Sequence, residues 1–150
     1  MHIRAVRKGV ELAKTEVTQI ADVGYFAQFK NLGSLGFDKA LDAVDFNLNY
    51  PACGYAYVSN LIIFTGKKLT PVLETTSISD AGAFYSSEDY IIPSEKGGIA
   101  NHIIFVKSSA EYEEKEVKKD EFVQVLQKQE YSIALYKWTG EKLVKIKELK

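Results

Sequence analysis

The clearest pattern in the chain is an alternation of apolar and polar residues over positions 43–50. The apolar positions are Val44, Phe46, Leu48 and Tyr50, and the polar positions between them are Asp45, Asn47 and Asn49. A period of two places successive side chains on opposite faces of a strand. The pattern therefore predicts a β-strand whose apolar side chains face the core and whose polar side chains face solvent. Pro51 ends it by removing a hydrogen-bond donor.

Other segments also have the features of strands. Residues 55–64 are largely apolar at both alternating positions, which predicts a central strand covered on both faces. Gly66 marks a turn after it. Further predicted strands are 71–76, 83–92 and 99–107, and then a closing hairpin of 122–138 and 143–149 with Gly140 in its turn. Successive strands joined by short turns must pair antiparallel.

Three segments are less decided. Residues 3–20 carry apolar positions at helical spacing, but Gly9 and the β-favouring residues 15–18 favour strand. Both forms remain open up to Lys14, and a strand is expected over 16–23. Residues 24–41 predict a long, partly buried loop. The run EYEEKEVKKDE at 111–121 is nearly all charged, which predicts a solvated hairpin tip or a short surface helix.

Together these segments predict a mainly β fold of seven to nine strands. The expected architecture is an antiparallel twisted meander or a small sandwich, with at most one or two short helices. The alternative is an α+β fold with an N-terminal helix. The chain has 150 residues, 46% of them hydrophobic and 26% charged, which is typical of a single globular domain over 1–150.

Composition and charge exclude several classes of protein. The net charge of −1 argues against nucleic acid as a partner, because phosphate binding needs a basic surface. No apolar run reaches the roughly 18 residues of a membrane-spanning helix, so no membrane span is expected. The single cysteine, Cys53, cannot form an intramolecular disulfide. No signal peptide is visible, which fits either a cytoplasmic protein or a trimmed envelope protein.

Candidate catalytic residues are few. The chain has two histidines, His2 at the terminus and His102 within an apolar strand, and neither has a catalytic neighbour in sequence. Cys53 has no adjacent cation to lower its pKa, so we expect it not to be a nucleophile. The remaining possibility is a cluster of carboxylates. One cluster is Asp38, Asp42 and Asp45, which Asp22 precedes, and a second is Asp80, Glu88 and Asp89, for which a surface turn is the alternative. We therefore expect a protein that is not an enzyme and that needs no cofactor.

Two aromatic segments stand out as a candidate binding surface. They contribute Tyr50, Tyr55, Tyr57, Phe84, Tyr85 and Tyr90. Tyrosine is enriched at protein interfaces because it is large and rigid and has a polar tip. If some of these rings are exposed together, the expected partner is another protein. The alternative is that all six pack within the sheet.

The segments QIADVG at 19–24 and GFDKALDAVDFNL at 36–48 resemble the FG-GAP-type repeat of β-propeller and related bacterial envelope proteins. LIIFTGKKLTPVL, AFYSSEDYIIPSEKGG and YKWTGEKLVKI are similar to the segments after such repeats in uncharacterised envelope proteins. The resemblance implies a scaffold or adhesion role, a location in the periplasm or cell envelope rather than the cytoplasm, and calcium ligands at Asp22, Asp38 and Asp42. The insert YFAQFKNLGSL interrupts that ligand set, so we expect no tight calcium site.

Three functions remain as hypotheses. The first is a non-catalytic module that binds a protein or a ligand. The second is an inhibitor or immunity-type protein that blocks a partner enzyme with a protruding loop, such as 108–121 or 24–37. The third is a small enzyme that uses a carboxylate cluster, which would need those groups in a deep pocket.

Overall fold

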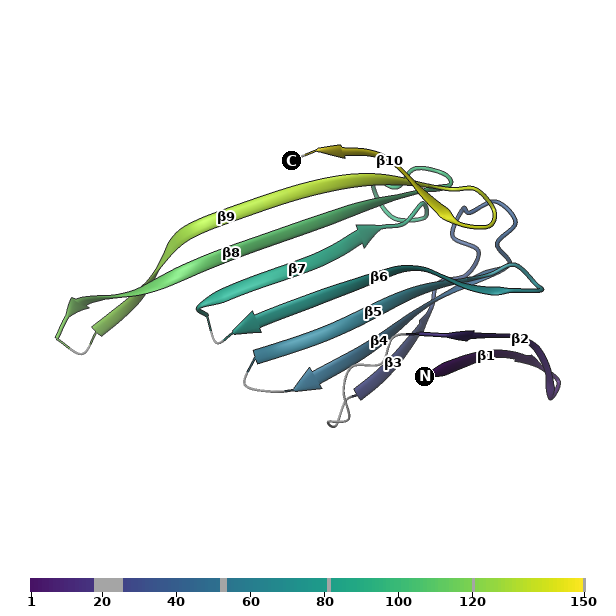
Figure 1. Ribbon diagram of the computed structural model, residues 1–150, viewed down its shortest axis with the longest axis horizontal. Helices are drawn as coiled ribbons and strands as arrows, with labels where there is room; N and C mark the ends of the chain where they lie inside the picture. Colours follow the sequence, from purple (N-terminus) through teal and green to yellow (C-terminus); the bar gives the residue numbers. More distant parts are fainter. Residues whose placement is uncertain (18–25, 52–53, 81, 120, 150) are drawn as a thin grey trace.

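The computed structural model describes residues 1–149 apart from 18–25, 52–53, 81 and 120, and it describes the backbone alone at 26–27, 50–51 and 54–55. The described residues form ten β-strands and no helix. Eight strands form one antiparallel meander in chain order, and the first two form a separate hairpin (Figure 1). The predicted mainly β fold is confirmed, and the alternative with an N-terminal helix is wrong.

The hairpin consists of β1 (His2–Arg7) and β2 (Val10–Glu16). The sheet consists of β3 (Phe26–Asn31), β4 (Asp42–Pro51), β5 (Gly54–Phe64), β6 (Leu69–Asp80), β7 (Phe84–Ile91), β8 (His102–Lys118), β9 (Glu121–Trp138) and β10 (Leu143–Leu149).

Local turn chemistry decides the N-terminal segment in favour of strands. Lys8 and Gly9 both have positive φ, at 50° and 80°. Two successive residues of positive φ make the two-residue turn whose twist matches antiparallel strands. The helical spacing of apolar residues is overridden: as a hairpin the segment packs Ile3, Ala5 and Ala13 against the sheet, while Val6 and Val10 stay exposed.

The hairpin covers one face of the sheet. Its residue Val17 and the strand residues Phe46, Leu48, Ile62 and Leu69 form a buried cluster. Phe46 and Leu48 are fully buried, as the alternation predicts, whereas Val44 is half-buried. The side chain of Tyr50 lies outside the described part of the chain.

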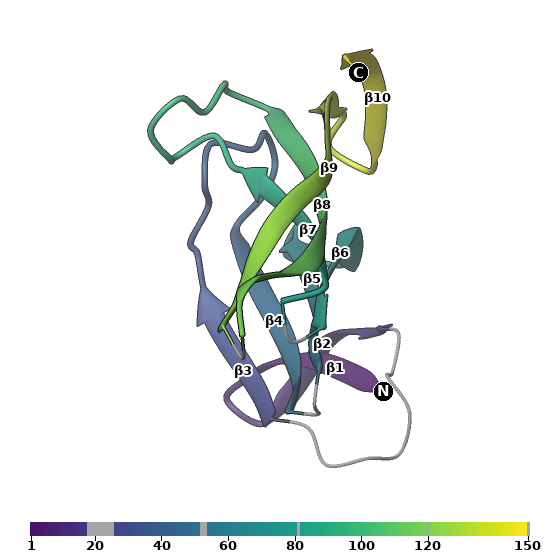
Figure 2. The same cartoon turned by 90° about the vertical axis from the view of Figure 1, so that its left-hand side faces the viewer.

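A second core lies on the opposite face, at one end of the sheet. It is formed by Leu35, Phe37, Ala43, Leu61, Ile63, Ile92, Ile103 and Trp138. The loops 32–40 and 92–101 cover this end, and they lie on the same side of the sheet (Figure 2). The Trp138 indole donates a hydrogen bond of 2.9 Å to the backbone oxygen of Asp38, and the Trp138 ring meets Phe37 edge to face.

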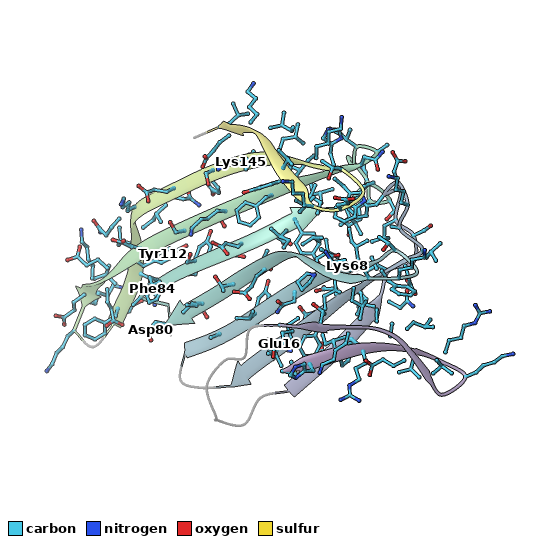
Figure 3. All side chains as sticks on the ribbon, turned by 45° about the vertical axis from the view of Figure 1, so that its right-hand side comes forward. Glu16, Lys68, Asp80, Phe84, Tyr112 and Lys145 are labelled. Atoms are coloured by element: carbon cyan, nitrogen blue, oxygen red, sulfur yellow. The ribbon has the colours of Figure 1, made fainter. Side chains whose placement is uncertain are left out.

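One sequence prediction is corrected, and one open alternative is decided. Residues 26–31, expected to be loop, form the edge strand β3, which pairs with β4. Of the two forms expected for the charged run 111–121, its described residues form the solvated end of a hairpin rather than a surface helix, because residues 111–118 pair with β9 beyond the point where β7 ends its pairing at Glu111. The resulting arm, residues 112–118 and 121–126, projects past the sheet (Figure 1). Phe84 and Tyr112 lie where it leaves the sheet (Figure 3).

Replacing Phe46 by alanine tests the first core. Phe46 is 0% exposed, so we expect the free energy of unfolding to fall by about 3–5 kcal/mol. The matched control is Phe122→Ala, because Phe122 is 56% exposed on the arm and should change stability little. Chemical denaturation of both variants measures the difference. Equal small losses would contradict the placement of Phe46 in the core.

Candidate functional site

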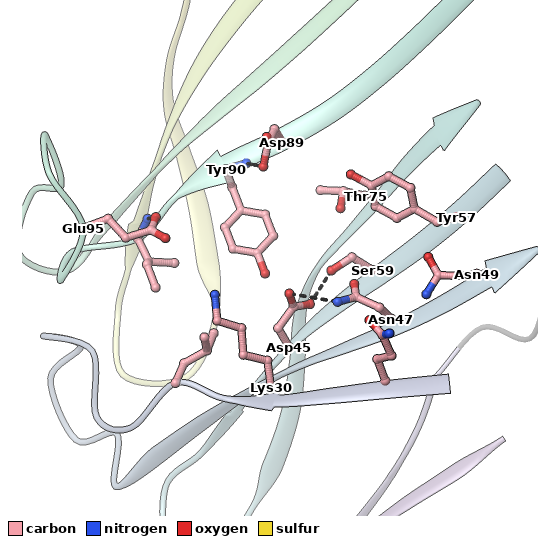
Figure 4. A pocket seen from close by; sticks show the side chains of 13 residues that line it. Lys30, Asp45, Asn47, Asn49, Tyr57, Ser59, Thr75, Asp89, Tyr90 and Glu95 are labelled. Atoms are coloured by element: carbon pink, nitrogen blue, oxygen red, sulfur yellow. Dashed lines mark hydrogen bonds between the residues drawn. The ribbon is translucent and has the colours of Figure 1, made fainter. Parts of the chain in front are cut away.

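A polar cavity of about 330 Å³ adjoins the second core on the same face of the sheet. We call it the polar cavity. Five strands and the two covering loops line it, through Gln28, Lys30, Leu32, Asp45, Asn47, Asn49, Tyr57, Ser59, Thr75, Asp89, Tyr90, Ile92 and Glu95 (Figure 4). Its volume is within the range of small-molecule sites.

The register of the central strands explains the position of the polar cavity. Along β4, Ala43 lies in the second core, and Asp45, Asn47 and Asn49 come after it on the same face. The residues paired with them on β5 change in parallel from apolar to polar: Ile63, Leu61, Ser59 and Tyr57. The face is therefore apolar under the loops and polar beyond them. Asp45, Asn47 and Asn49 are half-buried in this cavity rather than fully solvated, which refines the predicted wet face.

Asp45 is the centre of a hydrogen-bond network in the polar cavity. Its Oδ1 accepts a short hydrogen bond from the Ser59 hydroxyl, and its Oδ2 accepts one of 3.3 Å from the Asn47 amide (Figure 4). Ser59 is only 4% exposed, so this bond compensates the cost of burying its hydroxyl. The network fixes the Asp45 carboxylate against the floor of the cavity.

Tyr90 closes the network from β7. Burial, and then the negative charge of Asp45, raise the pKa of the Tyr90 hydroxyl above its usual range, while Ser59 acts in the opposite direction through a hydrogen bond. Tyr90 is therefore a neutral hydroxyl throughout the physiological range. β6 and β7 thus contribute to the same cavity although their pairing is limited to Ser77–Asp80 with Phe84–Ser87.

Glu88 links β6 to β7 beyond their last paired residues. Its Oε2 accepts hydrogen bonds from the Thr76 amide (3.1 Å) and hydroxyl (3.2 Å), and its Oε1 accepts one of 2.9 Å from the Lys107 amine. Burial alone would raise the pKa of Glu88, but the bonds from Lys107 and Thr76 lower it below its usual value. A carboxylate therefore replaces the missing backbone acceptor. Glu88 thus has a structural contact rather than the surface-turn position that the sequence suggested.

Five polar side chains at the polar cavity have no hydrogen-bond or ion-pair partner among the described residues. They are Gln28, Lys30, Asn49, Tyr57 and the buried Thr75. Figure 4 shows the Lys30 amine within the cavity, to the side of Tyr90 and Asp45 where Glu95 lies. These groups contrast with Asp45, Asn47, Ser59 and Tyr90, whose polar atoms hold one another.

The charged residues that line the polar cavity are unbalanced. They are three carboxylates, Asp45, Asp89 and Glu95, and one ammonium, Lys30, so the formal charge is −2. Asp89 accepts a bond of 2.8 Å from the Tyr90 amide, and Glu95 accepts one of 3.0 Å from the Ile92 amide. The lining is therefore acidic overall.

The six predicted aromatic residues are divided by the structure. Tyr57 and Tyr90 both line the polar cavity. Phe84 and Tyr85 begin β7 at its opposite end, where Phe84 is 39% exposed and Tyr85 is half-buried. The side chains of Tyr50 and Tyr55 lie outside the described part of the chain.

Sequence reasoning named Asp45 only as one member of a carboxylate cluster, and it missed most of the site, namely Gln28, Lys30, Asn47, Asn49, Ser59, Thr75 and Glu95. The available signal was Ser59 and Thr75, polar residues within long strands that are buried at 4% and 2% exposure. A polar side chain buried in a sheet needs a partner or a function.

Of the candidate metal and catalytic residues, Asp45 and Asp89 line the polar cavity, whereas Asp38, Asp42 and His102 do not. Asp42 accepts bonds from the Asn31 side chain and the Ala43 amide, and Asp38 lies on a covering loop. Asp22 and Cys53 are outside the described residues. Within the described part of the chain, no three metal-binding side chains converge. The His102 Nδ1 lies 2.7 Å from the backbone oxygen of Ala100, which is a local structural contact.

Comparison of the chain with protein-family models, with curated proteins and with solved structures gives no match. The resemblance to FG-GAP-type repeats and the envelope location that it implies therefore stay predictions. Among the described residues, no helix is long and apolar enough to cross a membrane.

Acid titration tests the Glu88 link. Because folding lowers the pKa of Glu88, its contribution to stability is present above the unfolded value near 4.5 and is lost as the pH falls through the folded value. We expect Glu88→Gln to be less stable at neutral pH and to lose less stability than wild type on acidification. Denaturation midpoints at several pH values measure this, with Glu130→Gln as the exposed control. If the denaturation midpoints of wild type and Glu88→Gln change with pH in the same way, the Glu88 link is contradicted.

Alkaline titration tests the buried state of Tyr90. Ordinary tyrosines ionise at about pH 10. Tyr90 should ionise only at a higher pH, because its pKa is raised. The absorbance of tyrosinate should therefore rise equally in wild type and Tyr90→Phe through the first transition. Folding raises the pKa of Tyr90. The free energy of unfolding should therefore fall as the pH rises above the pKa of tyrosine in the unfolded chain. A smaller first transition in Tyr90→Phe would show that Tyr90 is solvated.

Proposed function

We propose that this chain is a non-catalytic ligand-binding module and that the polar cavity is its binding site. The observation that carries the proposal is the division of the lining residues into two groups. Asp45, Asn47, Ser59 and Tyr90 hold one another in fixed positions, and Gln28, Lys30, Asn49 and Tyr57 keep polar ends without a partner among the described residues. A fixed base with free polar groups around it is a preorganised site, which lowers the cost of binding.

The state of the titratable groups supports binding rather than catalysis. A general acid or base must exchange a proton near the working pH. The raised pKa of Tyr90 makes it a poor acid at that pH, and the Asp45 carboxylate already accepts bonds from Ser59 and Asn47. The lining therefore supplies recognition groups rather than a reacting pair.

The arm supports a second candidate function, binding to another protein in the manner of an inhibitor. It projects beyond the sheet and exposes Val117, Phe122, Val123 and Leu126, with exposed fractions between 42% and 56%. A projecting apolar hairpin is suited to insertion into a partner's groove. This candidate uses a surface remote from the polar cavity, so the two can be tested separately.

A thermal-shift screen of polar metabolites, saccharides and short peptides tests the leading proposal. A ligand that binds the folded state raises the melting temperature as its concentration exceeds its dissociation constant. We expect stabilising compounds to lose most of their effect on Asn49→Ala and Tyr57→Phe, which remove polar ends in the cavity. Gln127→Ala, on the arm side of the sheet, is the matched amide control and should respond like wild type.

Two outcomes would contradict the proposal. Compounds that stabilise wild type and the cavity variants equally would move the binding site away from the polar cavity. Turnover of a stabilising compound that Asp45→Asn abolishes would show that the cavity is catalytic. Loss of stabilisation in Phe122→Ser alone would favour the arm.

A further inference from the structure

We infer that the ligand of the polar cavity is a neutral saccharide, bound as a short stretch of sugar residues. This inference rests on the proposed function and names its ligand class. It depends on three properties of the lining: its charge, its balance of donors and acceptors, and the aromatic rings beside its polar groups.

Charge argues against an anionic ligand. Asp45 on the cavity floor and Glu95 on the covering loop lie in the lining with a single ammonium, Lys30. A phosphate or carboxylate would therefore meet more negative than positive charge, and repulsion of this kind discriminates strongly when the groups are partly desolvated. Anion sites in proteins instead gather several cations or free backbone amides.

The placement of Lys30 argues against a cationic ligand. Its amine lies in the cavity beside Tyr90 and Asp45 (Figure 4), so a ligand ammonium bound at Asp45 would meet like charge. The other two carboxylates already accept backbone bonds, from the Tyr90 and Ile92 amides. A neutral ligand avoids both conflicts.

The free polar groups suit a ligand whose every polar atom both donates and accepts. The side-chain amides of Gln28 and Asn49 each present a carbonyl acceptor beside two N–H donors, and the Tyr57 hydroxyl does both. Adjacent hydroxyls of a sugar ring have the same dual character. One amide can therefore accept from one hydroxyl and donate to the next.

The aromatic residues supply the remaining requirement. A sugar ring has an apolar face made of C–H groups, which needs an apolar surface beside the polar contacts. Tyr57 and Tyr90 are half-buried in the cavity and offer such surface. The volume of about 330 Å³ is at the small end of the range for ligand sites, so it fits a short stretch rather than a long chain.

Titration calorimetry of the whole chain with neutral oligosaccharides tests the inference. The probes are cello-, malto-, manno-, xylo- and chito-oligosaccharides, with oligogalacturonate as the anionic probe and oligolysine as the cationic probe. We expect at least one neutral probe to bind. Gln28→Ala or Asn49→Ala should weaken it about tenfold by removing a hydrogen-bonding group, and Gln127→Ala should not. Salt should change the affinity little, because no charge pair forms.

The outcomes separate the class of ligand from the location of the site. If only charged probes or peptides bind, and Asn49→Ala weakens them, the saccharide inference is wrong and the polar cavity remains the binding site. If a neutral probe binds with equal affinity to wild type, Gln28→Ala and Asn49→Ala, it binds outside the cavity and the inference is overturned. If the cavity variants weaken the binding of no probe and of no compound of the thermal screen, both proposals fail.

Discussion

The polar cavity depends on the burial of Trp138 beneath two loops. Trp138 is 2% exposed, and its indole reaches the Asp38 carbonyl across 100 positions of the chain. Asn101 adds backbone bonds to Gly36 and Trp138, so both loops are held to the end of β9. An antiparallel meander brings only neighbouring strands together, so these contacts are what tie the first strands of the sheet to the last. Without them one face of the sheet would lack its cover.

The loops cover only part of that face, and this determines where a ligand can bind. Under the loops this face is apolar and carries the paired residues Ala43 of β4 and Ile63 of β5. Beyond the loops the same two strands carry Asp45, Asn47 and Ser59. The N-terminal hairpin covers part of the other face, over an apolar cluster from β4, β5 and β6. The face that carries the loops is divided between core and binding site. Polar groups that would destabilise a closed core are tolerated here because they are paired or face the cavity.

Local patterns predicted the strands whose alternation or apolar content is strong, such as 43–50, 55–64 and the closing hairpin. They failed for β3, which resembles a loop in sequence because it is a short edge segment. For the charged run they left a hairpin tip and a surface helix open, because both faces of that segment are solvated. The sequence pointed to Tyr57, Tyr90 and the carboxylate of Asp45 but missed Ser59 and Thr75 as site residues. The face on which they lie matters only once the loops 32–40 and 92–101 are placed, and no local pattern encodes that placement.

The most direct test of the central claim is a nuclear magnetic resonance titration that monitors side-chain amide signals as a neutral oligosaccharide is added to the labelled chain. The protein carries such amides in both regions of interest: Gln28, Asn47 and Asn49 line the polar cavity, and Gln124 and Gln127 lie on or beside the arm. The account predicts that the cavity amides shift together at one affinity while the arm amides stay in place. Shifts at Gln124 and Gln127 with unchanged cavity amides would contradict it.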